Sequence, residues 1–327
     1  MAAYVLRRLG QAALVVLVMS VLVFAGVYAI GNPLDILIHP EATQQDIARL
    51  SASLGLDRPV WEQYFVFLGQ ALTGNLGTSF AFNVPAIPLI LERLPATLEL
   101  AVAATAIAVL LGIPLGLWAG LKPDSVAGRT IMAGSILGFS LPTFWVGLVL
   151  IMTFSVELGW LPASGRGPTL DVLGIPVSFL TLEGLQHLAL PAINLALFKL
   201  GLVIRLVRGG TREAMMLDYV RFARAKGLSE PRVVGVHVLR NILIPVVTVV
   251  GLEFGSLIAF AVVTETIFAW PGMGKLLIDS INVLDRPVIV AYLCITVLVF
   301  VLINLVVDLL YALLDPRVRL AAAGAEA

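Results

Sequence analysis

The stretch ATLELAVAATAIAVLLGIPLGLWAGL, residues 96–121, decides the fold class because it carries a single charged residue, Glu99. In lipid a backbone must satisfy its own hydrogen bonds, so an apolar run of this length forms a helix. The whole chain has this character: 59% of its 327 residues are hydrophobic, 13% are charged and its mean hydropathy is +1.00. A soluble domain averages about 25% charged residues, which cover its outside. The sequence therefore predicts an integral membrane protein.

Five further apolar runs flank this stretch. They are residues 9–30, 131–156, 188–207, 242–263 and 288–314. The first run reaches about 33 Å at about 1.5 Å per residue, enough to cross a hydrocarbon core of about 30 Å. It is also longer than the core of a cleaved signal peptide, about 7–15 residues, so we expect a retained helix. We expect each run to form one helix. The runs contain, or end near, Pro114, Pro142, Pro191 and Pro245. Each proline leaves a backbone carbonyl without its hydrogen-bond donor, and neighbouring helices can cover that carbonyl.

The distribution of basic residues predicts the orientation. Cytoplasmic segments of membrane proteins are enriched in Lys and Arg. With the N-terminus inside, the inner segments hold most of the 21 basic residues: Arg7, Arg8, Lys122, Arg129, Arg205, Arg208, Arg212, Arg221, Arg224, Lys226, Arg232, Arg240, Arg317 and Arg319. The prediction is an all-α polytopic protein of the inner (plasma) membrane, with six transmembrane helices and both termini cytoplasmic.

This topology predicts four regions. Residues 1–30 form the first span, and residues 31–95 form an extracytoplasmic helical segment with helices at 41–54 and 61–72. Residues 96–314 form a five-helix transmembrane core that includes a cytoplasmic loop at 208–241, and residues 315–327 form a cytoplasmic tail. Whether the outer segment only caps the bundle or contacts a substrate stays open.

Several kinds of active site are absent from the sequence. The nearest match to a phosphate-binding Walker loop, Gly272-Met-Gly274-Lys275, is followed by Leu276, so it lacks the Mg²⁺-binding hydroxyl, and it lies on the predicted outer face. The only cysteine is Cys294, and the three histidines lie far apart, so we expect no metal site. A formal net charge of zero excludes a generally basic nucleic-acid binder. We expect no catalytic residues and no cofactor in this chain.

The cytoplasmic loop, residues 205–241, has a helix–glycine–helix pattern. Residues 211–226 are compatible with one helix, and Gly227 is a natural C-terminal stop. Ser229 can cap a second helix with Pro231 in its first turn. The pattern favours a protein-docking site, while the basic charge alone is also typical of contact with anionic lipid.

This loop resembles the cytoplasmic coupling motif of ATP-binding-cassette (ABC) importer permeases, in the peptide/nickel (dipeptide and oligopeptide) branch. Anchored on Gly227, Arg221-Phe222-Ala223 stands where the general motif has Glu-Ala-Ala, and Leu239-Arg240 stands where it has Leu-Pro. These departures are typical of one subunit type, the B-type permease of a two-permease pair. Other stretches that fit the branch span the chain: Tyr4–Leu9, Leu54–Pro59, Gly74–Ser79, Arg93–Leu100, Leu158–Pro162, Glu265–Gly274, Asn304–Tyr311 and Asp315–Arg317.

The resemblance implies an ATP-driven import mechanism. A second homologous permease chain completes the pathway, two ATPase subunits bind ATP and Mg²⁺, and an extracytoplasmic binding protein delivers the substrate. The ATPase-docking coupling helix implied here comprises Asp218, Tyr219, Arg221, Phe222, Ala223, Arg224, Ala225, Lys226, Gly227, Leu228 and Ser229. Tyr219, Phe222 and Leu228 are expected to fill a groove of the ATPase, and the basic residues to meet its acidic rim.

Two charges at membrane depth, Lys199 and Glu253, suggest a place on the translocation pathway, with structural pairing as the alternative. Gly112, Gly116 and Gly120 share one helix face and predict close helix packing. The substrates expected are peptides, with nickel complexes, glutathione and opine-like conjugates as alternatives. An ion-coupled transporter would show inverted repeats with broken helices, and a membrane-embedded enzyme would show a catalytic cluster, and neither signal stands out.

Overall fold

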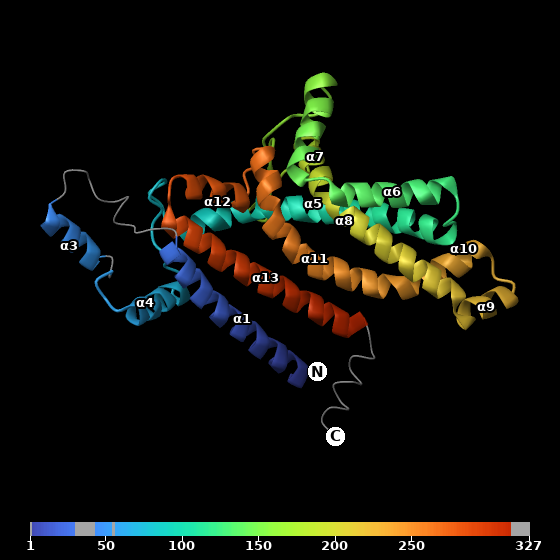
Figure 1. The fold of residues 1–327 in the computed structure, drawn as a ribbon, viewed down its shortest axis with the longest axis horizontal. Coiled ribbons are helices and arrows are strands. Elements are labelled where there is room, and N and C mark those ends of the chain that lie inside the picture. Colours follow the sequence, from blue (N-terminus) through green and yellow to red (C-terminus); the bar gives the residue numbers. More distant parts are fainter. Residues whose placement is uncertain (1, 30–42, 54–55, 315–327) are drawn as a thin grey trace. The chain divides into compact units, whose positions relative to one another are not determined.

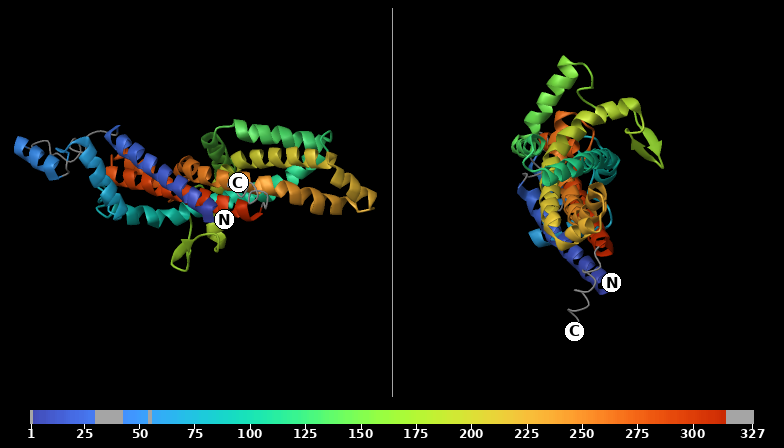
Figure 2. Two further views of the ribbon diagram at one scale, coloured as in Figure 1. Left: turned by 90° about the horizontal axis from the view of Figure 1, so that it is seen from below. Right: turned by 90° about the vertical axis from the view of Figure 1, so that its right-hand side faces the viewer.

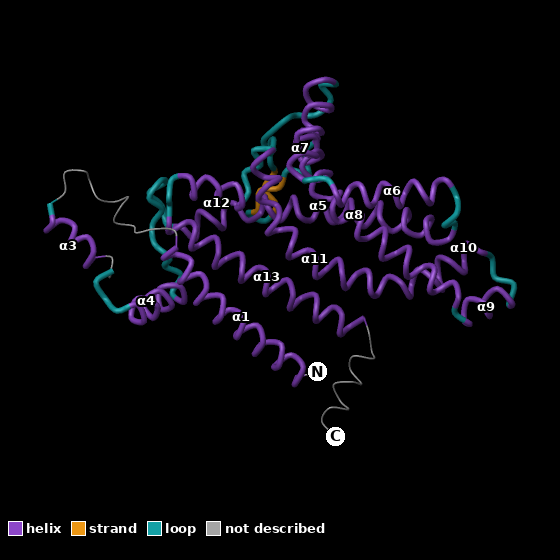
Figure 3. The backbone as a smooth tube through the Cα atoms, viewed as in Figure 1, coloured by secondary structure: helices purple, strands orange, loops and turns teal. Residues whose placement is uncertain are grey.

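The fold of a computed structural model of the chain is helical almost throughout, as Figure 3 shows. The structure describes residues 2–29, 43–53 and 56–314. The chain divides into two compact units, one made of Met1–Leu94 with Gly272–Leu302 and the other of Pro95–Pro271 with Ile303–Ala327. The predicted cytoplasmic tail, residues 315–327, lies outside the described residues.

The first unit contains the N-terminal membrane helix and the helices that follow it. Its elements are α1 (Ala2–Ala29), α3 (Gln44–Ser53), α4 (Val60–Leu72), the start of α5 (Ala86–Leu121), α12 (Met273–Asn282) and the first part of α13 (Arg286–Leu314). Helix α1 packs on α4, where the Ser20 and Tyr64 hydroxyls lie 2.9 Å apart and the Phe24 and Tyr64 rings 5.4 Å apart. The helices predicted at 41–54 and 61–72 are confirmed as α3 and α4.

A buried carboxylate fixes the loop before α5 in the first unit. Asp285 has no exposed surface and accepts hydrogen bonds from the Ser79 hydroxyl and from the backbone N–H groups of Phe80 and Ala81, the latter two at 3.1 Å each. Charged groups removed from water require such partners. These hydrogen bonds therefore hold residues 79–81 in a defined conformation. The regular structure of this loop is limited to an isolated β-bridge between Thr78 and Pro85.

The second unit is built around one long helix, α8 (Leu182–Met216). The most apolar 18 residues of α8 are 61% buried, whereas those of α1 are 6% buried. Helices α6 (Val126–Ser140), α7 (Thr143–Leu150) and α11 (Leu239–Ile267) pack against it. The remaining elements are the π-helix η1 (Ile151–Glu157), the strands β1 (Leu170–Val172) and β2 (Ile175–Val177), α9 (Asp218–Ala225), α10 (Glu230–Arg232) and the π-helix η2 (Val233–Val238). Figure 1 shows α9 and α10 at one end of α8.

The three glycines of α5 face α8, and an added side chain at each would collide with it. A Cβ atom at Gly112 would lie 2.7 Å from Val203 Cγ1, one at Gly116 would lie 2.7 Å from Val207 Cβ, and one at Gly120 would lie 2.7 Å from Thr211 Cβ. The branched side chains of α8 repeat at the same four-residue spacing as the glycines and fill the space that the glycines leave open. The predicted packing role of these glycines is confirmed.

The predicted single helix over residues 131–156 is wrong. Helices Val126–Ser140 and Thr143–Glu157 meet at a bend of 107°. Leu141 is extended (φ −82°, ψ 137°), which is the conformation that a following proline favours, and Pro142 is the N-cap of the next helix. Pro95, Pro114, Pro191 and Pro245 lie inside continuous helices, so proline alone does not cause the break.

A small antiparallel hairpin, which the sequence did not predict, interrupts the helical fold between η1 and α8. Val172 pairs with Ile175 across the two-residue turn Leu173-Gly174, and both turn residues have positive φ (55° and 82°). Such a turn matches the right-handed twist of its two strands. Figure 2 shows the hairpin projecting near the N-terminal end of α8.

The predicted polytopic helical membrane fold is confirmed. Within the described residues, five helices are long and apolar enough to span a membrane, and the bent pair makes a sixth when it is counted as one span. The number six and the cytoplasmic side of both termini stay predictions. The predicted division at 1–30, 31–95, 96–314 and 315–327 follows topology rather than compactness and also stays a prediction.

Candidate functional site

The loop that follows α8 begins with a break at Leu217. Helix α8 ends at Met216, Leu217 is extended (φ −78°, ψ 148°), and α9 starts at Asp218. The prediction of one helix over residues 211–226 is therefore wrong. The extended residue turns the chain out of the line of α8, so α9 forms a separate short helix with its own two faces.

One face of α9 is packed into an apolar cluster. Val220 and Ala223 are buried among Val203 and Val207 of α8 and Val233, Val238, Ile242 and Val246 of η2 and α11. Tyr219 and Leu228, two of the residues expected to fill a groove on a partner, pack against this cluster instead. Phe222 lies on the opposite face and is 62% exposed. Of the three, only Phe222 is exposed.

The charged residues of the loop pair among themselves at the surface. Arg224 Nε and Nη2 donate to the two carboxylate oxygens of Glu230 at 2.7 and 3.2 Å, and this hydrogen bonding raises the pKa of the Arg224 guanidinium. Arg221 lies 3.5 Å from Asp218, and Lys226 Nζ lies 4.6 Å from the centroid of the Phe222 ring. Exposed pairs of this kind are weak, so a partner can replace them at little cost.

The turn between α9 and α10 uses the glycine as predicted. Helix α9 ends at Ala225, and Gly227 has a φ of 74°, where its N–H donates to the Arg224 carbonyl at 2.8 Å. A positive φ favours glycine because a Cβ would clash with the backbone. Ser229 occupies the N-cap position of α10 with proline in the first turn, but its side chain makes no capping hydrogen bond.

The two predicted pathway charges are in contact near the middle of α8 and α11. Lys199 Nζ donates to Glu253 Oε2 and to Ser256 Oγ, the latter at 2.8 Å. The Lys199 side chain is 6% exposed and that of Glu253 is 39% exposed. The structural pairing foreseen as the alternative is therefore present, and it leaves the carboxylate as the accessible member of the pair.

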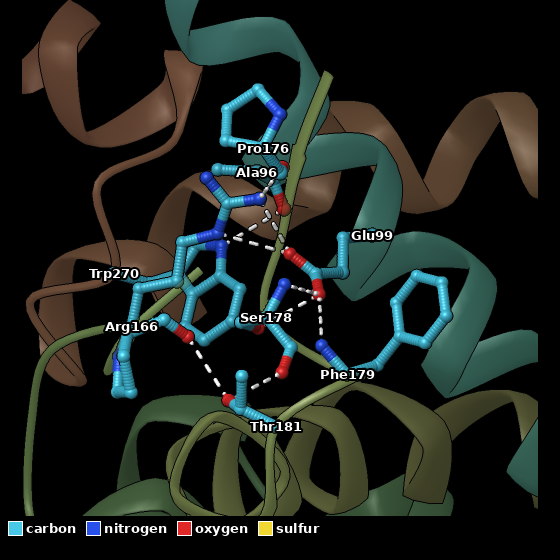
Figure 4. A network of polar contacts seen from close by, with 9 residues as sticks. Ala96, Glu99, Arg166, Pro176, Ser178, Phe179, Thr181 and Trp270 are labelled. Atoms are coloured by element: carbon cyan, nitrogen blue, oxygen red, sulfur yellow. Dashed lines mark hydrogen bonds and ion pairs between the residues drawn. The ribbon is translucent and has the colours of Figure 1, made fainter. Parts of the chain in front are cut away.

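A second buried charge network lies at the other end of α8, around the α5 turn Ala96–Glu99 (Figure 4). Glu99 Oε2 accepts hydrogen bonds from Arg166 Nε and Nη2 at 2.9 and 2.6 Å. Glu99 Oε1 accepts from the Ser178 N–H and hydroxyl, both at 2.7 Å, and from the Phe179 N–H at 2.9 Å. We call this set, with Thr97, Glu265 and Trp270 described next, the clasp.

The clasp also holds the segment after α11. Thr97 Oγ1 donates to Glu265 Oε1 at 2.7 Å, and Trp270 Nε1 donates to the Ala96 carbonyl at 2.8 Å. The sequence pattern around Glu99 and Glu265 does not predict this network. Their partners lie 67 and 168 residues away along the chain, a separation that no local spacing encodes.

Metal-binding clusters do not occur in the part of the chain that the structure describes, where no three His, Cys, Asp or Glu side chains are placed to hold an ion. The polar groups that come together at depth are instead ion pairs and hydrogen-bonded carboxylates. Such groups position backbone segments and tolerate charge inside an apolar fold.

Two family models match the chain. Residues 1–101 match "Binding-prot-dependent transport system membrane comp, N-term", and residues 112–320 match "Binding-protein-dependent transport system inner membrane component". Together they leave only short stretches unmatched, so the family is shown over both compact units.

Several relatives are similar over almost their whole length. The "Di/tripeptide transport system permease protein DppB" of Pseudomonas aeruginosa (strain UCBPP-PA14) is 41% identical over 333 residues, covering 98% of this chain and 99% of the relative. The "Dipeptide transport system permease protein DppB" of Escherichia coli (strain K12) is 39% identical over 337 residues, covering 97% and 98%. The "Oligopeptide transport system permease protein AppB" of Bacillus subtilis (strain 168) is 38% identical over 321 residues, covering 98% and 100%.

A solved structure shares the fold. A chain of the MetNI methionine ABC transporter superposes with a TM-score of 0.52 at 14% identity, covering 69% of this chain and 96% of that chain. At this identity the likeness concerns the fold alone. With the family models and the relatives it gives one consistent assignment: the chain belongs to the family of binding-protein-dependent transport system inner membrane components, as a multi-pass permease subunit of an ABC importer.

Proposed function

We propose that this chain forms half of the translocation pathway of an ATP-driven importer of dipeptides or oligopeptides. The names of the relatives support the substrate class, since di/tripeptide, dipeptide and oligopeptide systems all match over nearly the full chain. A second, homologous permease chain supplies the other half. An extracytoplasmic binding protein delivers the peptide, and two ATPase subunits, not this chain, bind ATP and Mg²⁺.

The observation that carries the proposal is the two-faced helix α9. Its buried face, Val220 and Ala223, is fixed in the cluster that also contains Val207 of α8 and Ile242 of α11. Its other face presents Phe222, Arg221 and Lys226. An aromatic anchor ringed by basic residues is typical of a docking hot spot. A push on α9 is passed to α8 and α11 because packed apolar contacts resist compression.

Transport requires two states of the bundle that nucleotide binding favours differently. The ATPases supply this bias by contacting α9, and the apolar cluster carries the displacement into the two membrane helices. The exposed pair Arg224–Glu230 breaks at little cost when an acidic partner approaches, so it does not lock the loop in one arrangement.

The Lys199–Glu253 pair supports a role on the pathway. A half-exposed carboxylate at membrane depth cannot face hydrocarbon, so it faces protein or a water-filled path. We propose that Glu253 lines the route of the peptide and that Lys199 and Ser256 hold its carboxylate in place there.

The docking proposal is tested by co-purification. The full permease pair, expressed with its ATPases, retains them through purification, and Phe222→Asp removes them because it puts a charge into the contact. The control Leu173→Asp places the same charge on the fully exposed hairpin tip, at 99% exposure, and keeps the ATPases bound. Uptake of labelled dipeptide by vesicles that contain no ATPase would sink the proposal, and it would favour an ion-coupled transporter.

The pathway proposal is tested by exchanging the charges. Lys199→Glu with Glu253→Lys keeps an ion pair between α8 and α11 but reverses its polarity. We expect ATP-dependent dipeptide uptake to fall by more than tenfold while ATPase association is retained. Unchanged uptake in the exchanged pair would remove the pathway role and leave the pair as a structural contact. Competition by nickel complexes, glutathione or opine-like conjugates in the same assay distinguishes the alternative substrates.

A further inference from the structure

Two long connections meet α5 at the turn Ala96–Glu99. The first connection, between η1 and α8, carries the β1–β2 hairpin. The second connection follows α11 and contains Trp270. Both lie at the end of α8 opposite to α9, because Thr181 caps the N-terminus of α8 while α9 follows its C-terminus.

The first connection is attached to Glu99 at its root. Five hydrogen bonds converge on one carboxylate, two from Arg166 and three from Ser178 and Phe179. Glu99 and Ser178 are buried, and the Arg166 side chain is 10% exposed. Arg166 Nη2 also donates to the Pro176 carbonyl at 2.6 Å, which ties both sides of the hairpin to the same guanidinium. Charge-assisted bonds at buried positions are the strongest that side chains form.

The second connection is attached one turn away and touches the first. Besides the bonds from Thr97 and Trp270, the Gly165 N–H donates to the Phe268 carbonyl at 2.9 Å. The Arg166 guanidinium lies 5.8 Å from the centroid of the Trp270 ring. Two of the stretches on which the family resemblance rests, 93–100 and 265–274, therefore meet in the clasp.

Close packing behind the hairpin leaves its root no room to shift. A Cβ at Gly184 would lie 2.1 Å from the Ser178 carbonyl oxygen, and the Thr181 hydroxyl donates to the Pro168 carbonyl at 3.0 Å. The tip of the hairpin is the opposite case, because Leu170, Leu173 and Ile175 are all exposed apolar side chains. A rigid root with an exposed apolar tip is suited to presenting a surface to a partner.

We propose that Glu99 is a positioning residue that fixes the hairpin for contact with the extracytoplasmic binding protein. This rests on the proposed function, in which α9 lies on the cytoplasmic side and the clasp therefore on the outer side. The partner is the soluble binding protein rather than lipid, because the root that fixes the hairpin is built of buried, directional bonds, which a fluid lipid surface does not require. Breaking the clasp weakens productive contact with the binding protein and leaves the α9 face unchanged.

The structural part is tested by hydrogen exchange of the purified permease–ATPase complex. Glu99→Gln removes the charge but keeps one acceptor oxygen, and Glu99→Ala removes both. The backbone amides of Ser178 and Phe179 should exchange about tenfold faster in Glu99→Gln and faster still in Glu99→Ala, while peptides of α9 exchange as in the wild type. Unchanged exchange over residues 176–181 in both variants overturns the proposal.

The functional part separates apparent affinity from turnover. Peptide-loaded binding protein is titrated against the ATPase activity of the assembled transporter. In Glu99→Gln the concentration that gives half-maximal stimulation should rise about tenfold, while the amount of co-purified ATPase stays at the wild-type level. A fall in maximal rate without a change in this concentration indicates a merely structural role and overturns the proposal.

Ser178→Ala serves if the Glu99 variants do not assemble. It removes a single hydroxyl bond and keeps the ion pair, so we expect the half-maximal concentration to rise about two- to threefold. An unchanged value in Ser178→Ala, with faster exchange at Phe179, also overturns the proposal. Failure of the proposed function is distinguishable, since it appears in the wild type as the absence of any bound ATPase.

Discussion

The two ends of α8 are built from opposite kinds of interaction. At its N-terminal end the clasp buries charges, and every oxygen of the Glu99 carboxylate accepts hydrogen bonds. At its C-terminal end the α9 loop buries only aliphatic side chains and leaves its ion pairs at the surface. One end is therefore held by hydrogen bonds that are costly to break, whereas the other is held by apolar packing and keeps its charges available for a partner.

The glycine seam between α5 and α8 connects the two ends, and breaking it has the largest expected effect. Gly116→Leu places a Cβ 2.8 Å from the Ile204 carbonyl oxygen, and a backbone atom cannot move aside. We expect a loss of about 4 kcal/mol or more in unfolding free energy, seen as a large fall in the thermal unfolding temperature in detergent.

Gly134→Ala in α6 is the matched control for the seam, because a Cβ at this position would have no heavy atom within 4 Å. This variant should unfold at or slightly above the wild-type temperature, with a gain of up to about 1 kcal/mol from helix propensity. Equal stability of Gly116→Leu and the wild type would show that the two helices do not pack as described.

The buried pair of the clasp comes next in size. Arg166→Met leaves the Glu99 carboxylate buried without its cationic partner. We expect a loss of about 3–5 kcal/mol, the range found when one member of a buried pair is removed. Thermal unfolding in detergent measures it, and Arg166→Met with Glu99→Met should recover part of the loss because no charge is then left unpaired. A double variant less stable than the single one contradicts this account.

The apolar cluster under α9 gives a smaller effect. Val220→Ala removes two methyl groups from a fully buried side chain and should cost about 2 kcal/mol. Phe222→Ala, on the exposed face of the same helix, should change stability by less than about 0.5 kcal/mol. If Phe222→Ala destabilised the chain as much as Val220→Ala does, the two-faced description of α9 would be incorrect.

The exposed pair of the α9 loop gives the smallest effect. Arg224→Met makes the same chemical change as Arg166→Met, but its partner Glu230 lies at the surface. We expect a loss of no more than about 1 kcal/mol, which shrinks further in about 0.5 M salt because exposed charges are screened. Comparing the two arginine variants measures directly how much burial strengthens an ion pair in this protein.

Most helices were predictable because their apolar runs exceed the thickness of a bilayer. The stop at Gly227 was predictable too, since few residues other than glycine adopt positive φ at a helix end. A proline inside an apolar run, by contrast, had different effects at different positions. Pro142 follows a break of 107°, whereas Pro191 lies inside continuous α8, and the difference depends on how neighbouring helices pack.

A reader of the sequence can predict a helical, multi-pass membrane protein, the glycine face of α5 and the helix–glycine–helix loop. Length, apolar character and backbone preference are local properties, and local spacing records them. The fold as a whole, and no local pattern, determines the extended Leu217, the packing of Tyr219 and Leu228 against the cluster, and the clasp. A buried charge is stabilised by whichever donors the fold brings to it, and here they come from distant parts of the chain.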